Sequence, residues 1–194
     1  MASREPRLGG SELVDLRDAV VAALRVAFPV GVKTIEKHRG EWTAASVKSY
    51  SRRAPALIVI AHGTTEAQTM GTSNVRTSLS LSVAVMASIN DGDADDPCLL
   101  MVRALLGLIS ENTWGLECVS APESIRAQNL YTGKADGPGI NLWAVTWEQP
   151  IDLPAMTPEE FALLGDYLTT TTDHEPASAG EDEPAQTNEF EMNP

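Results

Sequence analysis

The sequence predicts an α/β (α+β) fold, in which a mixed or antiparallel sheet of about five to six strands packs against two main helices. Three segments support this prediction. Residues 13–28 repeat apolar side chains at three- and four-residue steps, as one face of a helix does. Residues 75–86 alternate strictly between apolar and small or polar side chains, which is the period of a strand. Residues 97–110 are apolar on most sides, which indicates a helix buried against the sheet.

Helix-breaking residues and apolar runs predict further elements in the first half of the chain. Pro29 ends the first helix, and a short strand is expected over residues 30–36. The polar region 37–54 is expected to be a long loop of the core. After Pro55, residues 56–61 form an unbroken apolar run, which is typical of a strand covered on both faces.

The residue pattern of the second half of the chain predicts further strands and one small helix. Residues 116–121 and 125–131 are expected to be strands, and residues 140–149 a closing strand with apolar side chains on both faces. Prolines then end the sheet. A short amphipathic helix is expected over residues 157–167, because a proline and two acidic residues suit its first turn.

Charge is distributed very unevenly along the chain. Residues 1–134 hold 14 Lys and Arg and 14 Asp and Glu, whereas residues 135–194 hold 13 acidic residues and no Lys or Arg. We expect a flexible N-terminus over residues 1–10, one folded domain over residues 11–168 and a disordered acidic tail over residues 169–194. Bulk charge of this sign argues against nucleic-acid binding, because phosphates repel it.

Candidate metal and cofactor motifs are incomplete. In the loop Asp91–Asp96, alternating aspartates resemble the start of a calcium loop, but Asp96 stands where that loop needs glycine and Val102 where it needs glutamate. The pair Gly133-Lys134 lacks the hydroxyl residue and the distant glycine of a phosphate loop. We therefore predict neither a metal nor a cofactor.

No arrangement of residues in the sequence predicts catalysis. Cys98 and Cys118 are expected to fill the core of a protein in a reducing compartment. His62 follows a buried strand, so a small hydrolase that combines it with Asp91–Asp96 is a less favoured alternative. The sequence contains no Gly-x-Ser-x-Gly elbow that would expose a serine nucleophile. It also contains no run of about 20 apolar residues that would span a membrane.

Two groups of strand residues are candidates for an interface. Arg76, Ser78, Ser80 and Ser82 share one face of the alternating strand, and short side chains there allow another surface to approach closely. A solvated sheet face is the alternative interpretation. On the closing strand, Trp143 and Trp147 share a face, where they either pack in the core or, if exposed, form a binding hot spot.

The order of these elements resembles the tail terminator, or tail completion, family of Mu-like bacteriophages. The resemblance covers about residues 12–152. It rests on the helix that ends in Ala27-Phe28-Pro29, the strand 55–60, the alternating strand 76–87, the helix that begins at Pro97 and the closing strand 143–150.

This resemblance implies a structural, non-enzymatic virion protein at the head-proximal end of the tail, assembled in the host cytoplasm. Such proteins form homo-oligomeric rings, commonly hexamers, that stop growth of the tail tube and present a docking surface to the head–tail connector, while DNA passes without specific binding. The serine-bearing face or the strand edges are then expected to form ring or tube contacts. The tail Asp173–Glu191 is expected to dock on a basic surface of the connector or tube. A soluble adaptor or regulatory binding module without catalysis is the alternative.

Overall fold

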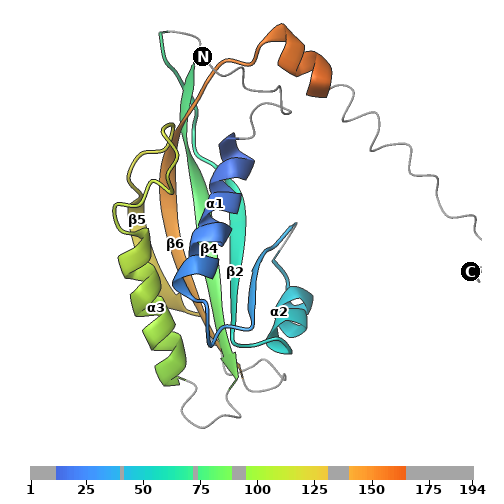
Figure 1. Ribbon diagram of the computed structural model, residues 1–194, viewed down its shortest axis with the longest axis vertical. Helices are drawn as coiled ribbons and strands as arrows, with labels where there is room; N and C mark the ends of the chain where they lie inside the picture. The colour runs from blue at the N-terminus through green and yellow to red at the C-terminus, as the bar shows by residue number, and fades with distance from the viewer. Residues whose placement is uncertain (1–11, 40–41, 72–73, 89–94, 131–139, 165–194) are drawn as a thin grey trace, which may run out of the picture. The chain divides into compact units, whose positions relative to one another are not determined.

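The computed structural model describes residues 12–39, 42–71, 74–88, 95–130 and 140–164 (Figure 1). The chain divides into two compact units, residues 1–156 and 157–194. In chain order, the elements of the first unit are α1 (Glu12–Ala27), β1 (Thr34–Lys37), α2 (Ala44–Ser51), β2 (Ala56–Thr64), β3 (Gln68–Thr69), β4 (Val75–Ser88), α3 (Asp95–Ile109), β5 (Glu123–Asn129) and β6 (Ile140–Leu153).

The strands of the first unit form one mixed sheet. Its six strands, within the described residues, lie in the order β1-β2-β4-β6-β5, and β3 pairs with β4 beside this path. β1 runs parallel to β2, and the other pairs are antiparallel. β4 and β6 pair over their whole lengths, from Val75 opposite Leu153 to Ser88 opposite Ile140. The predicted fold class is therefore confirmed.

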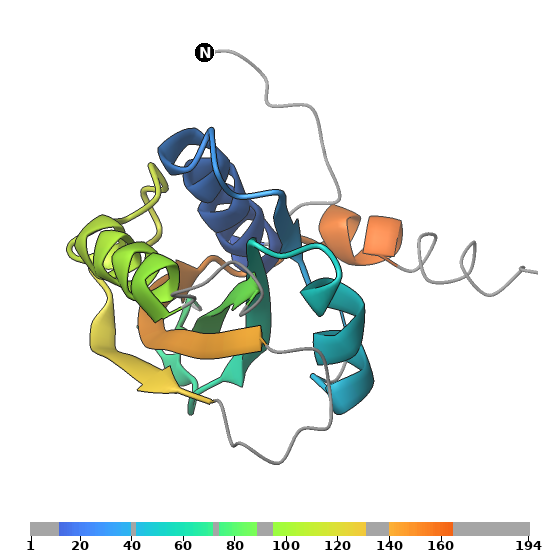
Figure 2. The same ribbon diagram turned by 90° about the horizontal axis from the view of Figure 1, so that it is seen from below.

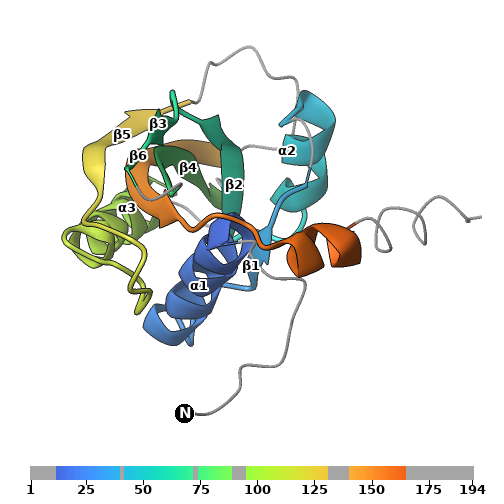
Figure 3. The ribbon, with the colours of Figure 1, turned by 90° about the horizontal axis from the view of Figure 1, so that it is seen from above.

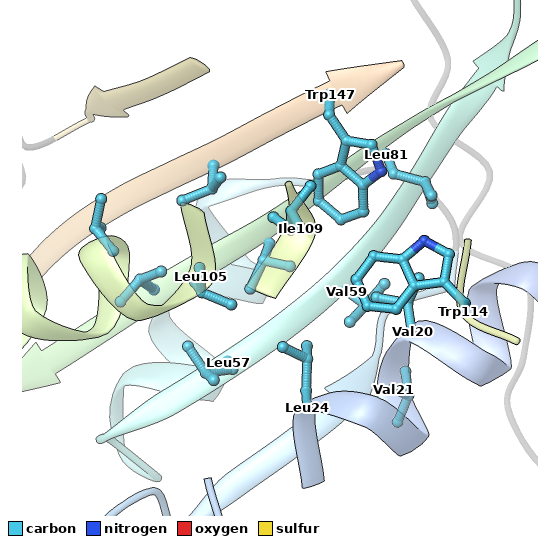
Figure 4. Close-up of a cluster of buried hydrophobic side chains, with 14 of the residues drawn as sticks. Val20, Val21, Leu24, Leu57, Val59, Leu81, Leu105, Ile109, Trp114 and Trp147 are labelled. Carbon is cyan, nitrogen blue, oxygen red and sulfur yellow. The ribbon is translucent and has the colours of Figure 1, made fainter. Parts of the chain in front are cut away.

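Helices α1 and α3 cover one face of the sheet (Figures 1 and 2). They bury their apolar stripes against alternate residues of β2, β4 and β6, and Figure 4 shows this cluster. Its fully buried members include Leu16, Val20, Leu24, Leu57, Val59, Leu81, Leu105 and Ile109. Each such side chain contributes about 1.5–3 kcal/mol relative to an exposed one. This cluster is the main source of the fold's stability.

The short helix α2 lies on the opposite face of the sheet, beside β2 (Figures 2 and 3). There Trp42 and Tyr50 pack on a second, smaller cluster that contains Ile58, Ile60 and Met86. β2 is thus covered on both faces over its first five residues, which confirms the prediction from its unbroken apolar run. Beyond Ile60 the residues of β2 are exposed.

Three sequence predictions about local structure were wrong. The region 37–54 is not one loop, because it contains α2, whose N-cap residue Thr43 accepts a hydrogen bond from the Ser46 amide. Residues 116–121 form turns with a single bridge, between Val119 and Ile151, rather than a strand. The first strand lies over Thr34–Lys37, later than the expected 30–36, because Gly31 has a left-handed φ of 88° that turns the chain before it.

The second unit contains a helix over residues 158–164. Thr157 and Glu160 form a reciprocal capping box, in which each residue's amide donates to the other's side chain, at 2.7 and 3.2 Å. The predicted start of this helix is confirmed. The expected tail 169–194, the flexible N-terminus 1–10 and the pair Gly133-Lys134 lie outside the described residues.

Candidate assembly interface

The strand alternation places a row of small and polar side chains on the sheet face opposite α1 and α3. We call this row the serine face; it consists of Arg76, Ser78, Ser80 and Ser82 of β4 and their cross-strand partners Asp152, Pro150, Glu148 and Thr146 of β6. The aromatic side chains under α2 cover a different part of this sheet face, around Ile58 and Met86. Ser78 and Ser80 are half-buried and Arg76 is exposed. A partner surface can therefore approach the β-sheet backbone closely at these positions.

At one end of the serine face, an ion pair joins the two long strands. Arg76 donates from Nε and Nη2 to the two carboxylate oxygens of Asp152, at 2.6 and 2.7 Å. This hydrogen bonding and the opposite charges raise the pKa of Arg76 and lower the pKa of Asp152. Both groups therefore stay charged at neutral pH, and the surface at this end presents a fixed dipole.

At the other end of the serine face, Ser82 is not accessible. It is 3% exposed, and its hydroxyl lies 2.7 Å from His62 Nε2. A register shift between Ala61 and Gly63 inserts His62 as an extra residue in β2, beside β4. Ser82 can therefore support an interface only by holding His62, which is itself exposed.

Glu148 lies in the middle of the serine face, opposite Ser80 on β4. Its Oε2 atom is buried but has no hydrogen-bond partner among the described residues. On the neighbouring strand its register partner is another acid, Glu123. Buried carboxylate oxygens are normally paired, so this atom is an exception within the described part of the chain.

The two tryptophans of β6 lie on the other face of the sheet, under the helices. Trp147 is 1% exposed and belongs to the main core, and the half-buried Trp143 packs against the same cluster. The interpretation of these two tryptophans as an exposed binding hot spot is therefore wrong for Trp147 and does not fit the half-buried Trp143. The physical reason is the register, which places the odd-numbered residues of β6 on the face that α3 covers.

Gln149 is a buried polar residue that the sequence reasoning missed. It is 0% exposed, and its Oε1 accepts hydrogen bonds at 2.9 Å from the indole N–H groups of both Trp114 and Trp147. Its Nε2 donates to the carbonyls of Asn112 and Ser120, at 3.3 and 2.5 Å. These four bonds join β6 to the segment between α3 and β5. A glutamine two residues after a tryptophan on an apolar strand face is the signal that would have indicated it.

Aromatic side chains attach α2 to the sheet. Trp42 and Tyr50 stack with ring centroids 5.8 Å apart and planes 14° apart, and His38 meets both rings edge-on. The Arg53 guanidinium lies 4.9 Å from the Tyr50 ring centroid. This cluster fills space that small residues of β2 and β4 leave, so its role is structural.

The two edges of the sheet differ. At the β1 edge, Arg25 of α1 donates from Nε and Nη2 to the carbonyl of Ile35, at 3.2 and 2.9 Å, and so covers an outward-facing acceptor. At the opposite edge lies β5, whose side chains are exposed except for the half-buried Ile125. Two cavities of about 380 and 330 Å³ lie beside α1 and β1.

The residues that a hydrolase site or a metal site would need do not lie together within the described residues. Asp91 and Asp93 of the acidic loop lie outside those residues, and the serine that His62 contacts is buried away from any substrate. No group of three or more potential ligands among His, Cys, Asp and Glu occurs in the described ranges. Cys98 is buried, and burial raises the pKa of the half-buried Cys118 thiol. No helix in these ranges is long and apolar enough to span a membrane.

Comparison with known protein families gives one match. The family model described as Bacteriophage Mu, Gp37 matches residues 12–151. This range begins with α1 and ends within β6, so it contains the main core, the sheet and nearly all of the serine face. No curated protein matches the chain.

Proposed function

Because the chain belongs to the bacteriophage Mu Gp37 family, a family of phage structural proteins, we propose that it caps the head-proximal end of the tail tube as a ring. In this role it stops polymerisation of the tube and provides the docking surface for the head–tail connector. Its partners are other copies of itself, the tail tube protein and the connector protein. DNA passes through the ring without specific binding.

The serine face is the observation that supports this proposal most directly. A cyclic ring needs two different complementary surfaces on each subunit, and the contact must close at a fixed rotation. The serine face offers close approach over Ser78 and Ser80 and an exposed charge at Arg76. The exposed edge strand β5 lies next to β6 and extends this surface. Such a surface can be buried against a neighbour without large rearrangement.

A charge-swapping double variant tests this role. Arg76→Glu with Ser80→Arg should block tail completion, so that electron microscopy shows overlong tubes or tails without heads. Both substitutions are at positions that are exposed or half-buried, so the purified variant should retain its unfolding midpoint within a few degrees.

The matched control introduces the same two residues, one Glu and one Arg, on the exposed side of α3. Arg103→Glu with Ala104→Arg changes charge and size in a similar way, and both positions are exposed. This control should complete tails normally. Normal tails from the serine-face variant would contradict the proposed contact, as would equal failure of both variants.

A further inference from the structure

A groove runs beside β1 and is separate from the serine face. The two cavities beside α1 and β1 share Arg25 and Glu36 in their linings, so they adjoin each other, and we call them together the edge groove. Its apolar lining includes Val21 on α1 and Phe28, Pro29 and Val32 in the segment between α1 and β1. The lining of the edge groove therefore combines apolar side chains with the charged side chains described next.

The charges of the edge groove do not balance. Its two carboxylates are already paired: Asp18 lies 2.7 Å from Lys37 and 3.0 Å from Arg17, and Glu36 lies 2.8 Å from Arg53. Burial opposes ionisation of Asp18, but the hydrogen bonds and charges of Lys37 and Arg17 outweigh it and lower its pKa.

Three further cations of the groove have no carboxylate partner within the described ranges. Lys33 and Arg39 lie more than 4 Å from every carboxylate there, and among the same residues Arg25 donates to the Ile35 carbonyl. The edge groove is therefore a basic site with unused hydrogen-bond donors. Planar guanidinium groups such as that of Arg25 suit carboxylates especially well.

A peptide with acidic residues around an apolar one would complement this lining. The chain itself contains such a peptide, because Asp173–Glu191 has seven acidic residues, no Lys or Arg, and Phe190 between Glu189 and Glu191. We propose that the edge groove binds the acidic segment Asp173–Glu191 of a neighbouring copy. This inference rests on the proposed ring, in which every copy has a neighbour to supply the segment.

Such an exchange would add a second contact between adjacent subunits. Carboxylates would contact Lys33, Arg39 and Arg25, and Phe190 would pack on apolar lining residues such as Phe28 and Val32. Because the cations are exposed or at the rim, the attraction should weaken strongly with ionic strength. The β1 edge would bind the segment through side chains, since Arg25 already covers the Ile35 carbonyl.

Peptide binding tests this inference independently of ring formation. The protein is the full chain with the seven acidic residues of Asp173–Glu191 changed to their amides, which leaves its own groove unoccupied. The probe is a fluorescent peptide of residues 169–194, and anisotropy measures its affinity at low and high salt. We expect saturable binding, at least about tenfold weaker after Lys33→Glu with Arg39→Glu and also weaker in high salt.

The matched control is Lys48→Glu with Arg52→Glu, which makes the same charge change at exposed positions on and beside α2. It should bind the peptide nearly as well as the parent protein. Absence of binding, or equal weakening by both double variants, would overturn the inference, and the basic partner of the tail would then lie on another protein. Binding by a protein that forms no ring would support the groove but contradict the ring.

Discussion

Gln149 shows how one side chain can determine the packing of a core. Its amide accepts hydrogen bonds from two buried indole N–H groups and donates to two backbone carbonyls. An unpaired buried donor or acceptor costs about 1–3 kcal/mol, whereas each bond that satisfies one contributes only about 1 kcal/mol. Removing Gln149 should therefore cost more, through the buried groups that it leaves unpaired, than its own hydrogen bonds contribute to stability.

Replacing this amide should destabilise the protein severely. Gln149→Ala would leave the Trp114 and Trp147 indoles unpaired and would create a cavity, so we expect a loss of about 3–5 kcal/mol in the free energy of unfolding. Urea unfolding followed by tryptophan fluorescence measures this loss.

Gln128→Ala provides the control on the exposed strand β5, where the change should stay within about 0.5 kcal/mol. Similar losses for both variants would show that the Gln149 hydrogen bonds do not stabilise the core as described.

At the scale of elements, α2 is the part of the fold that depends most on a few contacts. It has eight residues, too few to be stable as an isolated helix, and Ser51 is its one buried residue. Its attachment relies on the stacked pair Trp42 and Tyr50, which pack on small and aliphatic residues of β2 and β4. The helix should therefore detach before the main core unfolds.

Trp42→Ala tests this dependence. Removing a half-buried indole from the second cluster should lower the free energy of unfolding by about 1–3 kcal/mol and speed hydrogen exchange of the α2 amides. Exchange in α1 and α3 should stay close to that of the parent, because those helices pack on the other sheet face.

Ser49→Ala changes an exposed position of the same helix and should leave the exchange of α2 unaffected. Uniformly faster exchange throughout the first unit of Trp42→Ala would contradict a locally attached helix.

Long elements were predictable because their periodicity extends over many residues. The elements α1, β4, α3 and β6 are each 14 residues or longer, and the residue pattern of each predicted the correct type of element. α2 was missed because its eight residues have weak amphipathicity, and it is defined by its Thr43 cap and its aromatic contacts. Residues 116–121 looked like a strand, but Trp114 and Gly115 adopt positive φ angles and turn the chain there.

The candidate site was predictable only in its outline. Alternation alone placed Arg76, Ser78 and Ser80 on the face opposite the helices. The burial of Ser82 follows from a one-residue shift in β2, which depends on strand pairing and leaves no pattern in the sequence. The edge groove likewise depends on how α1 lies against β1, since it joins residues about 15 positions apart.

At the scale of the whole molecule, the chain belongs to a family of phage structural proteins, and we propose that two of its surfaces contact neighbouring copies. The serine face lies on the sheet face opposite α1 and α3, and the edge groove lies beside α1 and β1. In the proposed assembly each surface contacts a different part of a neighbouring copy, and such heterologous contacts favour a closed ring or an open filament over a two-fold dimer. The net charge of −13 per chain should limit unspecific association and DNA binding.

The most direct test of the proposed ring is the mass of the purified protein by light scattering over a range of concentrations, alone and mixed with tail tubes. We expect a discrete species of about six subunits, either free or assembled on the tube ends. It should form less readily in the Arg76→Glu, Ser80→Arg variant. A protein that stays monomeric at every concentration and does not bind tubes would contradict the account and favour a soluble adaptor instead.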